Sequence, residues 1–369
     1  MSAVKNFLDR LGGTFLVSAM VPTLAFVSFC LLAFEPILPE PMHQALALGE
    51  DFDPVGRTGI IALIITIVIG FTLTSLSTFN LKVFEGYVLI QRLKFLRRGE
   101  LKKYRRMKAK LDQIDRRIKQ LNTQRGPNIK RMRSSLEDKK YSLSVELQER
   151  FPSREADILP TSFGNILKAA EYYPRLRYQI DSVPIWTRLV HVIPPAYEAK
   201  IDQSYNQLVF LVNCSLLCLA FTGMAFFASF YQFILLQAKL QVNSPAWIPY
   251  FIRDNLTETT PLIFEQRVWL YGIVAVMALF MSLVFQRAAL LSVGEFGDTI
   301  RSSYDLFRFD LLRQLHLPLP VNSNVEQTQW YRLSNFFNLG HDKYSKPLEY
   351  QHPTSVRAGK LFQEETSEG

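Results

Sequence analysis

The chain is poor in the residues and motifs from which most enzyme and metal sites are built. Its 369 residues include three cysteines and five histidines, and the histidines are dispersed along the sequence. No histidine has the spacing to a neighbour that metal ligands show. Phosphate-binding glycine loops, zinc-protease motifs and nucleophile elbows are also missing. We therefore expect no catalytic residues, no metal and no cofactor.

Charged residues are absent from the interiors of four long apolar runs, at residues 14–34, 59–79, 207–238 and 268–291. A helix crosses the ~30 Å hydrocarbon core of a membrane with about 20 mostly apolar residues. Backbone groups in lipid must pair within their own segment or in a closed barrel, and the strict alternation of barrel strands is missing. The runs predict an all-α integral membrane protein with four transmembrane helices arranged as two hairpins.

Small residues recur at helical spacing in the third and fourth runs. Cys214, Cys218 and Thr222 are four residues apart, and Ala278 and Ser282 offer a matching face. Small side chains let membrane helices approach closely. We expect these residues to serve helix packing rather than redox or metal chemistry, and we expect no disulfide.

Basic residues are missing from residues 35–56, whereas residues 81–206 carry 27 Lys and Arg against 14 Asp and Glu. Connecting segments rich in Lys and Arg stay on the cytoplasmic side of a membrane. The predicted cytoplasmic parts are therefore 1–13, 80–206 and 292–369, and the predicted outer loops are 35–58 and 239–267, the latter with an interfacial segment at 244–251. Both termini are expected in the cytoplasm.

Residues 80–150 predict a basic helical hairpin. Apolar residues follow one another at spacings of three or four, close to a heptad seam; they are Leu101, Tyr104, Met107, Leu111, Ile114, Ile118 and Leu121. Turn-forming residues at 124–128 break this pattern. A returning stripe follows at Met132, Leu136, Leu143 and Leu147. The pattern favours an antiparallel coiled coil.

The flanks of this seam are strongly basic, notably at Lys102, Lys103, Arg105 and Arg106. Charge runs are usually solvated helix faces. A second interpretation is attraction to anionic lipid, worth about 1 kcal/mol per basic residue near a membrane surface. Nucleic-acid binding is not expected, because no nucleic-acid fold motif accompanies the charge.

Residues 151–206 form a different element, rich in proline and aromatic residues. Arginines alternate with amphipathic rings here, including Arg175, Arg177, Tyr178 and Trp186. Such rings suit the headgroup layer of a membrane. They suit a small packed domain with arginine–aromatic stacking equally well, and both interpretations stay open. These four residues are predicted lipid or partner contacts.

After the fourth run, residues 292–340 predict cytoplasmic amphipathic helices. Apolar residues from Ile300 to Leu315 recur every three or four positions, and Pro318 ends the pattern. Ser323 and Glu326 have the spacing of a capping box for a last helix. Residues 341–369 lack apolar periodicity, and we expect them to be weakly ordered.

Two strings, LPTSFGNILKAAEYYPRLRYQID and SSYDLFRFDLLRQLHLPLP, resemble those of an uncharacterised bacterial family of multi-pass, four-helix inner-membrane proteins. That family combines an LPTxxGNxLxAAE…RYxID stretch with a DLxRFDLL stretch. The resemblance implies a bacterial inner-membrane origin and no particular activity. It also suggests one structural polar nucleus, formed by Asn165, Glu171, Asp181, Arg308 and Asp310. Within it, we expect Arg308 to pair with Asp181 or Glu171.

These features favour a non-enzymatic scaffold or signalling component of the inner membrane. It would act through protein and anionic-lipid contacts of its cytoplasmic helices, as a homo-oligomer or as a subunit of a membrane complex. The alternative is an oligomeric channel or membrane-permeabilising effector gated by those helices. Ion flux and a continuous aqueous path would distinguish the two.

Overall fold

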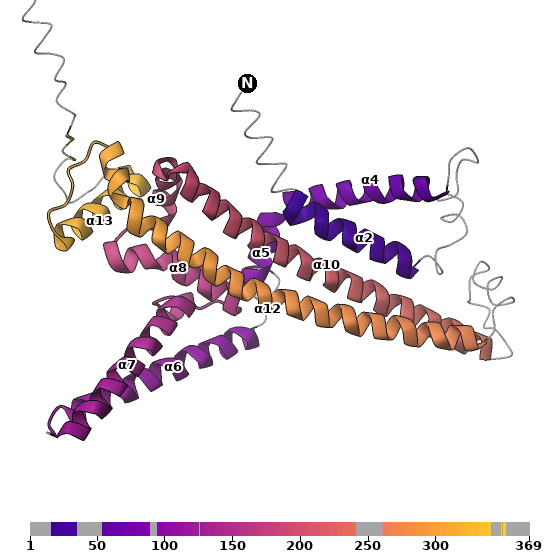
Figure 1. Ribbon diagram of the computed structural model, residues 1–369, viewed down its shortest axis with the longest axis horizontal. Coiled ribbons are helices and arrows are strands. Elements are labelled where there is room, and N and C mark those ends of the chain that lie inside the picture. The colour runs from indigo at the N-terminus through magenta and orange to yellow at the C-terminus, as the bar shows by residue number, and fades with distance from the viewer. Residues whose placement is uncertain are drawn as a thin grey trace, which may run out of the picture. The chain divides into compact units, whose positions relative to one another are not determined.

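The computed structural model describes residues 16–34, 54–88, 94–124, 126–240, 261–340, 348, 350 and 351. All regular structure in these ranges is helical, with no strand, which confirms the all-α prediction (Figure 1). Residues 1–13, most of both predicted outer loops, the interfacial segment 244–251 and most of the tail 341–369 lie outside the described residues.

The chain divides into two compact units. The first comprises residues 1–103, 159–165 and 203–296, and the second comprises residues 104–158, 166–202 and 297–369. The division falls inside several helices, so each unit is described by itself. The helices in chain order are η1 (Leu16–Met20), α2 (Val21–Phe34), α4 (Pro54–Ser75), α5 (Ser77–Glu85), α6 (Lys94–Leu121), α7 (Pro127–Arg150), η4 (Glu155–Asp157), α8 (Ser162–Tyr178), α9 (Ser182–Leu189), η5 (Val190–Val192), α10 (Pro195–Leu240), α12 (Pro261–Gln314) and α13 (Ser323–Leu339).

Helices α10 and α12 are long and apolar enough to cross a membrane. They contain 46 and 54 residues. At 1.5 Å per residue these helices measure about 70 and 80 Å, more than twice the hydrocarbon thickness. Helix α12 continues without a break through 291/292, where the predicted fourth membrane run ends and the predicted cytoplasmic helices begin. No proline interrupts the chain between Pro261 and Pro318, so nothing forces the helix to stop there.

The second apolar run is a broken helix rather than one straight span. Helices α4 and α5 are bent by 57° at the break around Leu76. Hydroxyl groups of Thr72 and Thr74 donate to the carbonyls of Val68 and Gly70, four residues earlier. Such back-bonding competes with the helical ladder and bends helices. The run also continues beyond the predicted end at 79, to Glu85.

The structure therefore contains two candidate membrane spans, or three when α4 and α5 count as one. The apolar helix of the first run, Ser18–Phe34, is shorter than a full span within the described residues. The backbone one turn before Pro22 is hydrogen-bonded to another helix of the first unit. Pro22 offers no amide hydrogen to the carbonyl of Ser18 four residues earlier, and the side-chain amide of Asn213 on α10 donates to that carbonyl at 2.8 Å.

Helices α10 and α12 meet in the first unit through small and polar side chains. Ser215 and Ser282 each donate to the other's backbone carbonyl, at 3.2 and 3.0 Å. Farther along, Ser229 donates to the carbonyl of Val268. Fully buried Ala225 lies on α10 between Ser215 and Ser229. Close approach with hydrogen bonds between helices is typical of membrane interiors, where apolar side chains gain little from burial.

The core of the second unit is built from α8, α9, α13 and the end of α12. Tyr304 and Trp330 are its largest fully buried side chains. The hydroxyl of Tyr304 donates to the carbonyl of Ser182, and the backbone amide of Asp181 donates to Ser334. Burial of these two rings stabilises the folded state by several kcal/mol, at about 25 cal/mol per Å² of apolar surface removed from water.

The predicted capping box of the last helix is wrong. The N-cap of α13 is Asn322, whose side chain accepts from the amides of Asn324 and Val325. Ser323 is the first helical residue. Glu326 does not reach back to the cap, because its carboxylate pairs with Arg308 instead.

Candidate functional site

The range predicted as a basic hairpin, 80–150, contains the end of α5 followed by α6 and α7. Its second-unit part consists of α6 from Tyr104 onward and α7 (Figure 1). An ion pair between Lys140 and Asp115 joins the two helices, and Arg133 donates to Asn122 near the turn. Every predicted seam residue of α6 is buried or half-buried. On α7 no residue is fully buried: Leu136, Leu143 and Leu147 of the predicted stripe are half-buried, and Met132 is exposed.

The basic side chains of α6 fall into two kinds. Lys103 pairs with Glu100 at 2.6 Å, and Arg105 pairs with Glu155. Lys102 and Arg106 are exposed, and the structure shows no ion pair for either within the described ranges. Of the four predicted lipid contacts on this helix, two are thus already engaged inside the protein and two are available to a partner.

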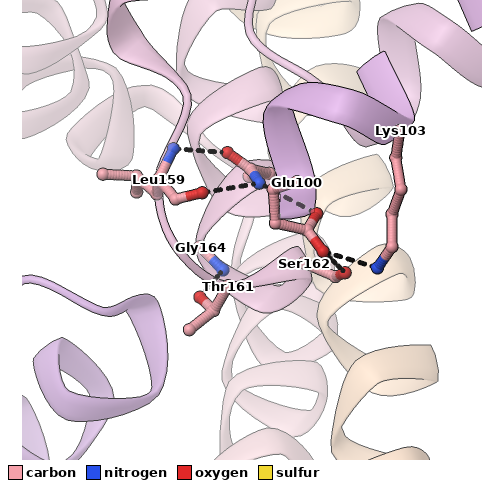
Figure 2. A network of polar contacts seen from close by, with 7 residues as sticks. Glu100, Lys103, Leu159, Thr161, Ser162 and Gly164 are labelled. Carbon is pink, nitrogen blue, oxygen red and sulfur yellow. Dashed lines mark hydrogen bonds and ion pairs between the residues drawn. The ribbon is translucent and has the colours of Figure 1, made fainter. Parts of the chain in front are cut away.

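A second polar site surrounds Glu100 in the first unit (Figure 2). The carboxylate is buried, with 6% of its surface exposed. It accepts from the hydroxyl of Ser162 at 3.0 Å and the side-chain amide of Asn165 at 3.3 Å, and it pairs with Lys103. A buried charge is tolerated only when it is paired and hydrogen-bonded. Glu100 has no recognisable sequence signal, because an acidic residue in a basic helix shows no distinctive spacing.

Asn165 completes this site from the start of α8. Its side-chain oxygen accepts from the amide of Leu159 at 2.7 Å, and its amide also donates to the carbonyl of Leu159. Thr161 caps α8 by accepting from the amide of Gly164 and donates to the carbonyl of Glu85 at 2.8 Å. The segment 159–165 therefore connects the end of α5 to the beginning of α6, and we call it the LPTSFGN clamp.

Two glycines make the clamp close-packed. A Cβ at Gly164 would lie 2.2 Å from the carbonyl oxygen of Glu85, so only glycine fits there. Gly86 ends α5 with φ of 91°, in the left-handed region, and a Cβ there would lie 2.6 Å from Cγ of Pro160. Glycine adopts such a conformation at low cost. The edge-to-face contact of Phe84 and Phe163 adds apolar packing.

A third site lies in the second unit around Asp305 on α12. Its carboxylate accepts from the hydroxyls of Tyr173 and Tyr178 at 2.9 and 2.7 Å. Burial raises the pKa of Tyr178, and donation to Asp305 raises it further. Arg308 stacks on the ring of Tyr178, with 4.2 Å from its guanidinium carbon to the ring centre, and pairs with Glu326 at 2.7 Å.

The predicted polar nucleus is not assembled as expected. Arg308 pairs with Glu326 rather than with Asp181 or Glu171. Glu171 pairs with Lys168, and Asp181 caps α9 and accepts from Asn338. The remaining two members also have other partners: Asn165 bonds Glu100 in the first unit, and Asp310 pairs with Arg313 at the surface. Asp305 lies one helical turn before Arg308 on α12 and accepts from Tyr173 and Tyr178, and it was not among the predicted members.

The arginine–aromatic element supports the packed-domain interpretation for several residues. Arg308 stacks on Tyr178, Arg177 lies over Tyr173, and the ring of Trp186 contacts Tyr304. Such contacts contribute about 0.5–1 kcal/mol each at exposed sites. Arg175 is exposed near the end of α8.

The residues of the predicted small-residue face lie at different depths in the helix contact. Ser282 bonds Ser215, the neighbour of buried Cys214. Cys218 is half-buried, and the hydroxyl of Thr222 donates to its carbonyl within α10. The half-buried Ala278 lies one turn from Ser282. Helical spacing locates the face approximately but does not select between adjacent residues.

Within the part of the chain that the structure describes, no group of three or more His, Cys, Asp and Glu side chains has a metal-binding arrangement. Comparison of the chain with protein families, with characterised proteins and with solved structures found no match.

Proposed function

We propose that this chain is a non-enzymatic integral membrane protein that acts as a scaffold or signalling component through anionic-lipid and protein contacts of its helical region. The observation that carries the proposal is the composition of α6, with twelve basic and three acidic residues. Most of the basic side chains are exposed. This helix belongs to the same chain as helices apolar enough to cross a membrane.

Several finer features belong to the same proposal. The four apolar runs would all span the membrane, with α4 and α5 as one broken span and both termini in the cytoplasm of a bacterial cell. Helices α6 and α7 would form an antiparallel coiled coil, and the protein would assemble as a homo-oligomer or within a membrane complex. The positive-inside rule supports the orientation, and the burial of the α6 seam supports the coiled coil.

The lipid contact is tested with the full chain in nanodiscs of zwitterionic lipid. We expect these nanodiscs to capture vesicles that contain phosphatidylglycerol and to ignore purely zwitterionic vesicles. Salt screens exposed charges over about 10 Å at 0.1 M and about 3 Å at 1 M, so capture should disappear at high salt. Equal capture of both vesicle types would refute the proposal, and so would no capture of either.

A channel is the second candidate, and one observation favours it. The first unit contains buried polar atoms without a protein partner, a condition that ordered water commonly relieves. They belong to the side chains of Thr66, Asn80, Asn213, Gln232 and Ser292. Reconstituted vesicles with the full chain would then conduct ions, and Asn80→Leu would reduce that flux. Absence of flux across a range of protein-to-lipid ratios would remove this candidate.

A further inference from the structure

The charges on the two flanks of the α6 seam differ within the second unit. One flank consists of the second-unit residues one position before the seam, Arg106, Lys110, Gln113, Arg117 and Gln120, spaced by 4, 3, 4 and 3 residues. We call it the leading flank. Residues at such spacing share one side of a helix. All five are exposed, and this part of the flank contains no acidic residue.

The opposite flank contains residues one position after the seam, Arg105, Lys108, Asp112, Asp115 and Lys119, and we call it the trailing flank. Its charges are largely neutralised inside the protein. Asp115 pairs with Lys119 and Lys140, and these lysines hold its pKa at about 2. Arg105 pairs with Glu155, and Lys108 lies over the ring of Tyr104.

We propose that the leading flank is the surface with which this protein binds anionic lipid headgroups. The inference rests on the proposed function and assigns its lipid contact to one side of one helix. Arg106 and Arg117 are eleven residues apart, so the three cations extend over about 17 Å of a straight helix. No ion pair competes for them among the described residues, so a lipid phosphate would not have to displace a carboxylate.

An anionic membrane fits this surface better than a nucleic acid does. The leading flank lacks the aromatic side chains on which single-stranded bases stack. Its cations form a line along an exposed helix, which suits contact with an extended plane of phosphates. Each basic residue near an anionic membrane contributes about a fivefold increase in affinity.

Two charge-matched variants of the full chain test this assignment in the nanodisc capture assay. The leading-flank variant carries Arg106→Gln, Lys110→Gln and Arg117→Gln. The control carries Arg105→Gln, Lys108→Gln and Lys119→Gln, which removes the same net charge from the same helix. We expect the leading-flank variant to lose roughly 100-fold in capture of phosphatidylglycerol vesicles, and the control to lose less than about fivefold.

A gain-of-charge variant distinguishes weaker lipid binding from loss of capture through misfolding. Gln113→Lys adds a fourth cation to the leading flank and should raise capture about fivefold. Equal losses in both triple variants would show that only net charge matters and would overturn the inference. Unchanged capture in both would overturn it too, while the wider proposal of lipid contact would stand.

Failure of the wild-type protein to capture anionic vesicles would instead refute the proposed function itself, and the inference with it. A last experiment adds single-stranded RNA as a competitor, at a phosphate concentration matched to that of the vesicles. RNA that displaced the vesicles and bound through the same three residues would make nucleic acid the partner and overturn the lipid assignment.

Discussion

The hydrogen bond from Asn213 to the carbonyl of Ser18 predicts an energetic coupling between Asn213 and Pro22. Asn213→Leu removes the buried side-chain amide that donates to the carbonyl of Ser18. Loss of such a bond costs about 1–3 kcal/mol in general, and membrane interiors average about 0.6 kcal/mol. The side-chain oxygen of Asn213 has no partner in the structure, so its removal offsets part of that cost. We expect a net loss of about 1 kcal/mol.

Pro22→Ala supplies the amide hydrogen that the proline withholds from Ser18. In that background the carbonyl gains a donor from its own helix, and Asn213→Leu should cost about 0.5 kcal/mol less than in the wild type. The measurement is a double-mutant cycle on the free energy of unfolding in mixed micelles titrated with sodium dodecyl sulfate. Additive costs of the two substitutions would refute the idea that Asn213 compensates for the proline.

Three further predictions concern the sites described above. Gly164→Ala places a Cβ against the carbonyl of Glu85 and should lower the free energy of unfolding by about 1–3 kcal/mol. Gly99→Ala, with open space around it in α6, should raise the free energy of unfolding by about 0.5–1 kcal/mol. Thermal unfolding that ranks the two variants otherwise would contradict the close packing of the clamp. Arg308→Met leaves Glu326 without its partner and should cost about 3–5 kcal/mol, and the double variant with Glu326→Leu should recover most of that loss in the same assay. The pKa of Tyr178 is raised in the folded state, so its stabilising effect is complete below the unfolded pKa of about 10 and is lost as pH rises toward the folded pKa. Chemical unfolding from pH 8 to about 12 should therefore show a smaller loss of unfolding free energy with pH for Tyr178→Phe than for the wild type. The same pH dependence in both proteins would contradict this prediction.

Local patterns predicted those parts of the molecule that depend on neighbouring residues. The spacing from Leu101 to Leu121 marks the buried side of α6, and Asp181 caps α9 as its sequence context suggests. The partner of Arg308 could not be found in this way. Glu326 has the spacing of a capping residue, and only the approach of α13 to α12 directs its carboxylate to the guanidinium instead.

Backbone conformation explains two other differences. Gln179 has φ of 61° just after α8, a backbone conformation that usually calls for glycine, so the sequence carries no signal for the end of that helix. The break at Leu76 follows from hydroxyl groups that bond their own helix. The sequence alone does not show which carbonyl a threonine hydroxyl will bond.

The bend at Leu76 leaves α5 with nine residues, far fewer than the ~12–15 that an isolated helix needs to be marginally stable in water. Its persistence must therefore come from its surroundings, and the LPTSFGN clamp holds its last residue. Helix and clamp should form and melt as one cooperative element. Amide hydrogen exchange at Lys82 and Val83 would then report on contacts made by Thr161 and Gly164, residues that are distant in the sequence.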